Sequence, residues 1–154
     1  MQAKLKTLRQ LDIACRLRAL HSSKAEQQQS QAKRALDTAK QALHSERDSY
    51  QSLILSAGQL RDSGVSLDPC LHEVRLLSQL QAHTQLQHSQ GAYEQADEAY
   101  QQETRQLMQC KRREEVVVKA HAQQTQLLNQ EHEHKEQLAI SDAQQAWRHN
   151  HDGL

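Results

Sequence analysis

Apolar residues recur along the first sixty residues with the spacing of a coiled coil. With Leu8 at position a of a heptad, one frame holds over eight heptads, and twelve of its sixteen a and d positions are apolar. About six would be expected from the overall hydrophobic share of 36%. A heptad pattern sustained over this length is typical of coiled-coil helices, so a helix is predicted from about residue 3 to 61. Its predicted seam comprises Leu8, Leu11, Cys15, Leu36, Ala39, Leu43, Tyr50, Leu53 and Leu60.

A second helix is predicted from about residue 69 to 148, with the same pattern in its middle part. Polar residues such as Ser89 and Glu103 interrupt the frame, and after Val117 it decays through Glu131 and Lys135. The predicted seam on this helix comprises Leu86, Tyr93, Ala96, Tyr100, Leu107, Cys110 and Val117.

The residues that break helices are concentrated between these two segments. Gly64 can end a helix in the left-handed conformation, and Asp68 followed by Pro69 is the pattern of an N-cap and a first helical residue. A turn at about 62–68 between two long helices predicts an antiparallel hairpin. The predicted fold is therefore all-α, with residues 1–154 forming a single two-helix coiled-coil hairpin whose second helix is longer. Folding back at residue 65 would place residue 8 beside residue 122, leaving about 20–25 residues of the second helix without a partner helix.

The composition excludes most enzyme folds. Aromatic residues make up 3% of the chain, Phe is absent, and only four Gly and one Pro are present. A compact core needs large apolar residues, and the rigid loops that carry catalytic sites need turn residues. Since no catalytic or nucleotide-binding motif occurs, a protein without enzymatic activity, catalytic residues or cofactor is predicted.

Candidate metal, redox and membrane features are weak. The chain has ten histidines, but His132 and His134 are two positions apart, which turns them to different faces of a helix, so no metal site is predicted. Three widely spaced cysteines, Cys15, Cys70 and Cys110, indicate reduced thiols in a cytoplasmic protein. The chain has neither an apolar run long enough to cross a membrane nor a secretory signal peptide.

Charge is distributed unevenly, although the net charge is zero. Residues 1–34 hold eight basic and two acidic residues, a net charge of +6, and residues 125–154 hold two basic and five acidic residues, a net charge of −3. A hairpin brings these segments to the same pole, where the charges either stabilise the helix pair or attract an acidic partner. Nucleic acid is not favoured, because no aromatic residues are interleaved with the basic ones to stack on bases.

Several apolar residues lie off the predicted seam. A two-helix seam uses one stripe of each helix, so apolar residues on other faces indicate contacts with a partner. They fall near the turn, in the run of three valines, and in the final part of the chain: Leu71, Val74, Leu76, Leu77, Leu80, Val116, Val118, Leu138, Ile140 and Trp147.

The whole chain resembles the FliJ/YscO family, the central-stalk proteins of flagellar and type III secretion export machinery. The features that carry the resemblance are the basic first segment, the break before the midpoint, the stretch from Tyr100 to Val116, and the Glu/Gln/His-rich EHEHKEQL before Trp147. The resemblance implies a hairpin similar to the coiled coil of the rotary γ subunit of F-type ATPases. It also implies a bacterial cytoplasmic protein, peripheral to the inner-membrane export apparatus, with no insertion into the membrane.

The same resemblance implies the partners and their contact residues. The terminal pole would enter and stimulate a hexameric export ATPase, and the chain would link it to the export gate protein and to secretion chaperones. The residues implied for the ATPase contact are Lys4, Leu5, Arg9, Arg16, Leu138 and Trp147. Those implied for the gate or chaperone contact are Leu76, Leu80 and His83.

Two other functions remain open from the sequence. One is a purely structural coiled coil that forms homodimers, and the other is an export or adaptor chaperone that holds an unstructured client. A stable dimer with buried ends would favour the first, and co-purification of a small secreted protein would favour the second.

Overall fold

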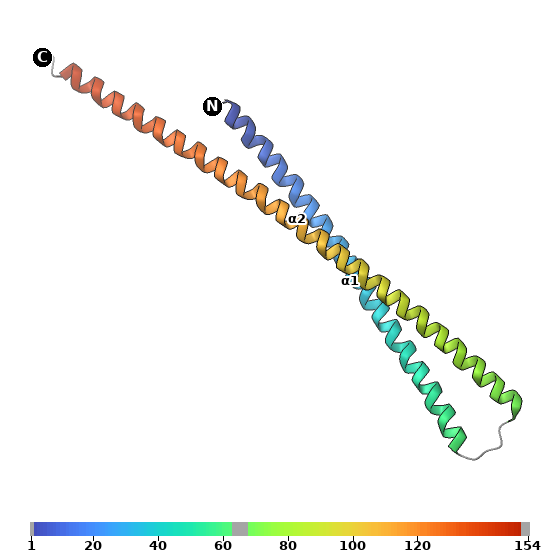
Figure 1. Ribbon diagram of the computed structural model, residues 1–154. Helices are drawn as coiled ribbons and strands as arrows, with labels where there is room; N and C mark the ends of the chain where they lie inside the picture. The colour runs from blue at the N-terminus through green and yellow to red at the C-terminus, as the bar shows by residue number, and fades with distance from the viewer. Residues whose placement is uncertain (1, 63–67, 152–154) are drawn as a thin grey trace. The chain divides into compact units, whose positions relative to one another are not determined.

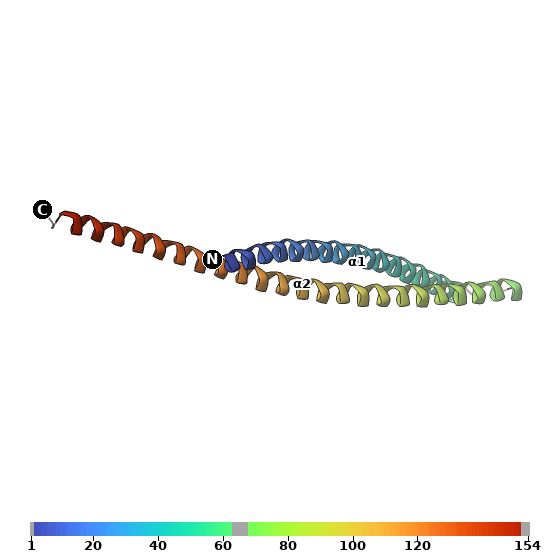
Figure 2. The same ribbon diagram turned by 90° about the horizontal axis from the view of Figure 1, so that it is seen from above.

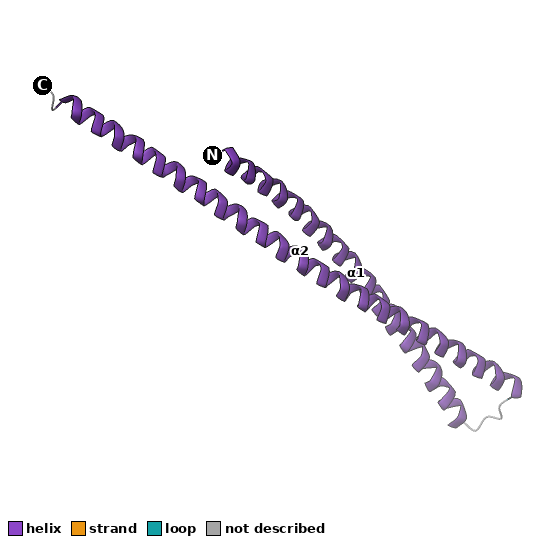
Figure 3. Cartoon of the chain, turned by 45° about the horizontal axis from the view of Figure 1, so that its top comes forward, coloured by secondary structure: helices purple, strands orange, loops and turns teal. Residues whose placement is uncertain are grey.

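The computed structural model consists of two long helices, as the heptad pattern predicts. Helix α1 spans Gln2–Asp62 and helix α2 spans Pro69–His151, and the structure describes the backbone of residues 2–62 and 68–151 (Figure 1). Neither range contains a β-strand, as the colouring by secondary structure shows (Figure 3). The prediction of an all-α antiparallel hairpin with a longer second helix is confirmed.

Asp68 caps the start of α2 with both its side chain and its backbone. The Cys70 amide donates a hydrogen bond of 3.0 Å to Asp68 Oδ1, and the His72 amide donates one of 3.0 Å to the Asp68 carbonyl. An N-cap oxygen satisfies amides that have no partner in the first helical turn, and proline at the next position needs no such partner. These contacts fix the residue at which α2 begins. Gly64, predicted to end the first helix, lies outside the described residues.

The chain divides into two compact units, and both helices contribute to each. The turn unit is Lys24–Leu107, and the terminal unit combines Met1–Ser23 with Met108–Leu154. Side chains are described for residues 4–59 and 68–148.

The turn unit has a thin core. Ala25 and Ser89 are its buried side chains among those described, while larger seam residues such as Leu43 and Leu86 are half-buried. Gln29 Nε2 donates a hydrogen bond of 3.4 Å to Thr104 Oγ1, and the rings of Tyr50 and His83 lie 5.8 Å apart between centroids. One stripe of each helix therefore holds this unit together, and the small residues allow the closest approach.

In the terminal unit, α1 lies along α2, and the contact reaches Lys4 (Figure 2). Lys4 Nζ donates to Glu131 Oε1 and forms an ion pair with it. Folding back at residue 65 would have set Lys4 beside residue 126, so the expected alignment is corrected by about five residues toward the carboxyl end of α2. The heptad pattern does not determine the residue about which the chain folds back.

The contact between the helices also continues beyond Val117, where the apolar pattern ends. His121, Gln124, Leu128 and Glu131 are half-buried at the positions that continue the a/d frame. The expectation that packing fades with the apolar pattern is wrong for this segment. The preceding seam already holds α1 against α2, so the side chains at the following a and d positions are half-buried whether they are apolar or polar. By contrast, every side chain of residues 132–148, which we call the distal segment, is exposed.

Candidate functional site

The structure places the predicted seam residues along the contact between the helices. Two of them differ: the Leu53 side chain is 37% exposed, and Leu60 lies outside the described side chains. The two helices diverge toward the turn (Figures 1 and 3). The Leu53 side chain at position d is therefore more exposed than the Tyr50 side chain at the preceding a position. The others are all half-buried: Leu8, Leu11, Cys15, Leu36, Ala39, Leu43, Tyr50, Leu86, Tyr93, Ala96, Tyr100, Leu107, Cys110 and Val117.

The residues implied for an ATPase contact all lie in the terminal unit but do not form one surface. Lys4 faces α2 and pairs with Glu131, while Arg16 pairs within α1 with Asp12 at 3.1 Å. Leu5 and Arg9 are exposed on other faces of the same helix. Leu138 and Trp147 are exposed on α2, but their nine-residue separation places them on opposite faces of that helix. A partner that contacts all six residues would have to surround this unit.

The ion pair between Lys4 and Glu131 is the main electrostatic feature that the sequence did not indicate. The hydrogen bond from the Lys4 ammonium group holds the pKa of Glu131 below its ordinary value, and the positive charges of Lys4 and Lys135 act in the same direction. On the outer surface of α2, Lys119 lowers the pKa of Glu115 in the same way, through a 2.7 Å contact. The charges at this pole thus tie the start of α1 to α2.

This arrangement predicts that acid loosens the first turns of α1. A carboxyl group whose pKa is lowered by folding stabilises the folded state above its unfolded pKa, and that contribution is lost as the pH falls through the folded value. Between neutral pH and about pH 3, amide hydrogen exchange near Lys4 should therefore rise relative to exchange at Leu43. The Glu131→Gln variant should exchange faster at neutral pH and show a smaller change with pH. An identical pH response in both proteins would contradict the assignment.

Near the turn, the residues implied for a gate or chaperone contact lie together. Leu76, Leu80 and His83 follow one another at helical spacing on one face of α2, and the two leucines are exposed. His83 also contacts the Tyr50 ring at an interplanar angle of 46°. Leu71, Val74 and Leu77 add exposed apolar area on neighbouring faces of α2, and α1 contributes exposed Ile54 and Leu55, which the sequence analysis did not single out.

Among the residues whose side chains are described, the main groove carries no recognisable catalytic arrangement. An open groove of about 650 Å³ in the turn unit is lined by Lys40, His44 and Arg47 of α1 and by Tyr93 and Glu94 of α2. Leu43 also lines it, so charged side chains surround a largely apolar floor.

The described part of the chain holds neither a metal-binding cluster nor a membrane-spanning helix. No group of three or more His, Cys, Asp or Glu side chains there could hold a metal ion. Cys15 and Cys110 are half-buried, Cys70 is exposed, and all three are free thiols. Within the same residues, neither helix has a window apolar and long enough to cross a bilayer.

Comparison with known proteins identifies no relative. No family model matches the chain, and no curated protein or solved structure matches it.

Proposed function

We propose that this protein is a non-enzymatic central-stalk component of a type III protein export apparatus. Its terminal unit would insert into a hexameric export ATPase and stimulate it, and the exposed leucines near the turn would contact the export gate protein and secretion chaperones. The observation that carries the proposal is the distal segment, in which α2 continues past the start of α1 with every described side chain exposed from residue 132 onward.

The physical support is that the described side chains form no broad core, while many large apolar ones among them are exposed. Soluble monomers seldom expose a group of large apolar side chains on a helix unless those side chains contact a partner. Tryptophan is a favoured anchor at such interfaces. The Trp147 side chain is 64% exposed, and Leu138 is exposed on the opposite face of the same helix. A helix with exposed apolar side chains on opposite faces is better suited to contact a ring of surrounding subunits than to contact one flat partner surface.

The test is the effect of the full chain on a purified hexameric export ATPase from the same genome. Stimulation of ATP hydrolysis that saturates near one chain per hexamer would support the stalk function. Binding without stimulation at the outer surface of the ATPase would instead indicate a peripheral stator, and no binding would overturn the proposal.

A matched pair of variants separates the two proposed surfaces. Leu76→Ser with Leu80→Ser changes exposed side chains of the turn unit and leaves the terminal unit intact. This double variant should keep full ATPase stimulation and lose binding to the export gate protein. Loss of ATPase stimulation would place the ATPase contact near the turn and contradict the assignment.

A further inference from the structure

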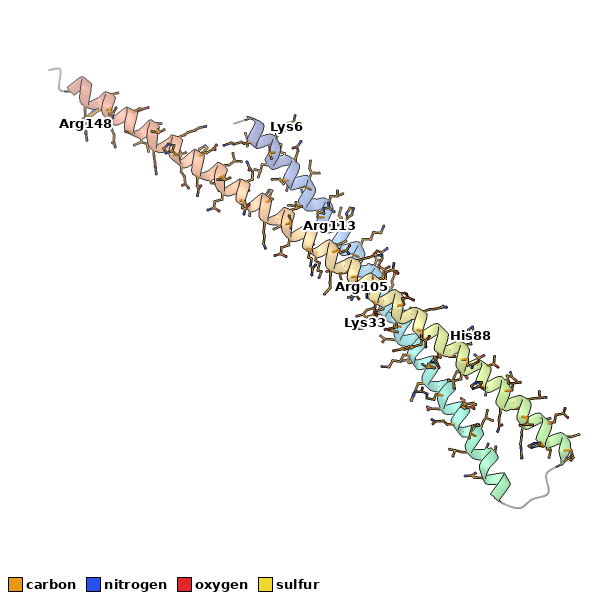
Figure 4. The ribbon with its side chains drawn as sticks, in the orientation of Figure 1. Lys6, Lys33, His88, Arg105, Arg113 and Arg148 are labelled. Atoms are coloured by element: carbon orange, nitrogen blue, oxygen red, sulfur yellow. The ribbon has the colours of Figure 1, made fainter. Side chains whose placement is uncertain are left out.

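Helix α1 carries a second stripe of side chains on the face opposite its seam. Residues 6, 9, 13, 16 and 20 repeat with alternating spacings of three and four, which is the pattern of a and d positions in a coiled coil. Ile13 and Leu20 are 66% and 68% exposed, and Lys6, Arg9 and Arg16 are exposed around them. Figure 4 shows Lys6 on the side of α1 that faces away from α2. We call this surface the outer stripe.

The distal segment carries a stripe with the same spacing. Residues 133, 136, 140, 143 and 147 fall on one face of α2, beginning with Glu133 and Glu136. Ile140 is 58% exposed, and a shallow hollow is lined by Ile140, Ala143 and Trp147 together with neighbouring Gln144 and Arg148. This stripe is acidic at its beginning and apolar toward its end.

We propose that the distal segment of one copy of this chain packs in parallel along the outer stripe of α1 in a second copy. In a parallel coiled coil, a positions pair with a positions and d positions pair with d positions. One constant offset then pairs every position of the two stripes. It sets Glu133 beside Lys6, Glu136 beside Arg9, Ile140 beside Ile13, Ala143 beside Arg16, and Trp147 beside Leu20.

The charges select this direction. An antiparallel alignment centred on Ile13 and Ile140 would set Trp147 against Lys6 and Glu133 against Leu20, so both charged groups would face apolar partners. In the parallel alignment, both acidic residues meet basic residues. Glu136 also has His132 as a partner in its own helix at 3.2 Å, and Arg16 keeps Asp12 at 3.1 Å, so neither charge depends on the second copy alone.

The occupant is a second copy because the outer stripe of this chain carries the matching charges, and because the chain cannot fold its distal segment onto its own outer stripe. Helix α2 is continuous from Pro69 to His151 and runs antiparallel to α1, whereas the matched register is parallel. The outer stripe lies on the face of α1 turned away from α2, and the stripe of the distal segment lies on the face of α2 turned away from α1. The contact is therefore head-to-tail and can repeat from one copy to the next. The inference does not rest on the proposed export function, but it uses the same distal segment, so self-association and insertion into the ATPase would exclude each other at that segment.

Sedimentation equilibrium with charge-reversal variants tests the pairing. The full chain should self-associate increasingly as its concentration rises, and Glu133→Lys with Glu136→Lys should weaken this association about tenfold or more, because ion pairs are replaced by repulsion. Adding Lys6→Glu and Arg9→Glu to that variant should restore self-association, since both signs are then exchanged. A monomer at all concentrations, or self-association unaffected by these changes, would overturn the proposal.

Disulfide crosslinking between copies tests the register. In a background with Cys15, Cys70 and Cys110 replaced by Ala, a mixture of Leu20→Cys and Trp147→Cys chains should crosslink on oxidation. A mixture of Leu20→Cys and Glu133→Cys chains, which are neighbours only in the antiparallel alignment, should not. Circular dichroism establishes that each variant remains helical, and crosslinking of the second mixture alone would contradict the parallel pairing.

Discussion

A chain that ends after Glu131 is expected to lose its stimulation of the export ATPase while keeping its hairpin. The truncation removes the distal segment, including Leu138 and Trp147, whose side chains are exposed in the full chain. It leaves the Lys4–Glu131 ion pair and the Asp68 cap in place. ATP hydrolysis should return to the basal rate of the ATPase, and circular dichroism should show helical content reduced only by the residues removed.

Point variants keep this prediction independent of the change in chain length. Trp147→Ala should raise the concentration of the chain needed for half-maximal stimulation about tenfold, the effect of losing about 1.4 kcal/mol of binding free energy, and more if Trp147 is the central anchor. Gln145→Ala alters an exposed side chain two residues away and should have no effect. Normal stimulation by the truncated chain would show that the distal segment is not the part that engages the ATPase.

The fold follows from the sequence because a single physical pattern determines it. One heptad frame from Leu8 locates the half-buried positions of α1, including polar ones such as Gln29 and Glu46. Asp68 and Pro69 mark the start of α2 because cap chemistry is local and needs no knowledge of the rest of the chain. Both signals act within a few residues or along one helix, so they can be recognised before any tertiary contact is known.

The alignment of the two helices could not be derived in the same way. A heptad frame shows which face of each helix is the seam but not where the chain folds back, so it does not determine whether Lys4 lies beside residue 126 or Glu131. That choice depends on the length of the turn and on the exact first residue of α2. The pairing of Lys4 with Glu131 and the contact of Tyr50 with His83 are therefore known only from the structure.

The candidate contact residues were also only partly predictable. Helical spacing correctly groups Leu76 and Leu80 on one exposed face, because spacing along a helix determines which residues are neighbours. The six residues implied for the ATPase contact came from resemblance, and they fall on different faces, with Lys4 turned toward α2. Ile54 and Leu55 follow Leu53 directly and lie off the seam, so their exposure could have been found from the same heptad frame.

Ala25→Asp is expected to destabilise the hairpin more than any other single substitution to Asp on the described part of α1. The Ala25 side chain is 5% exposed, and it is the one buried apolar residue among those described. A carboxylate at this position would lose its hydration without gaining a designed partner, which costs about 1–3 kcal/mol for a polar group in protein interiors and more for a charged one. Because the other described apolar residues of the seam are at most half-buried, little other packing can compensate.

The matched control is Ala35→Asp, the same substitution at an exposed position of the same helix. It carries the same loss of helix propensity, about 0.5 kcal/mol, but none of the burial cost. The difference between the two variants in the free energy of unfolding, measured by urea denaturation with circular dichroism, therefore isolates the cost of burial at Ala25. We expect a difference of about 2 kcal/mol or more. If the two variants unfolded at the same urea concentration, the helices would not close over Ala25 in solution, and the small residues would not be the points of closest approach.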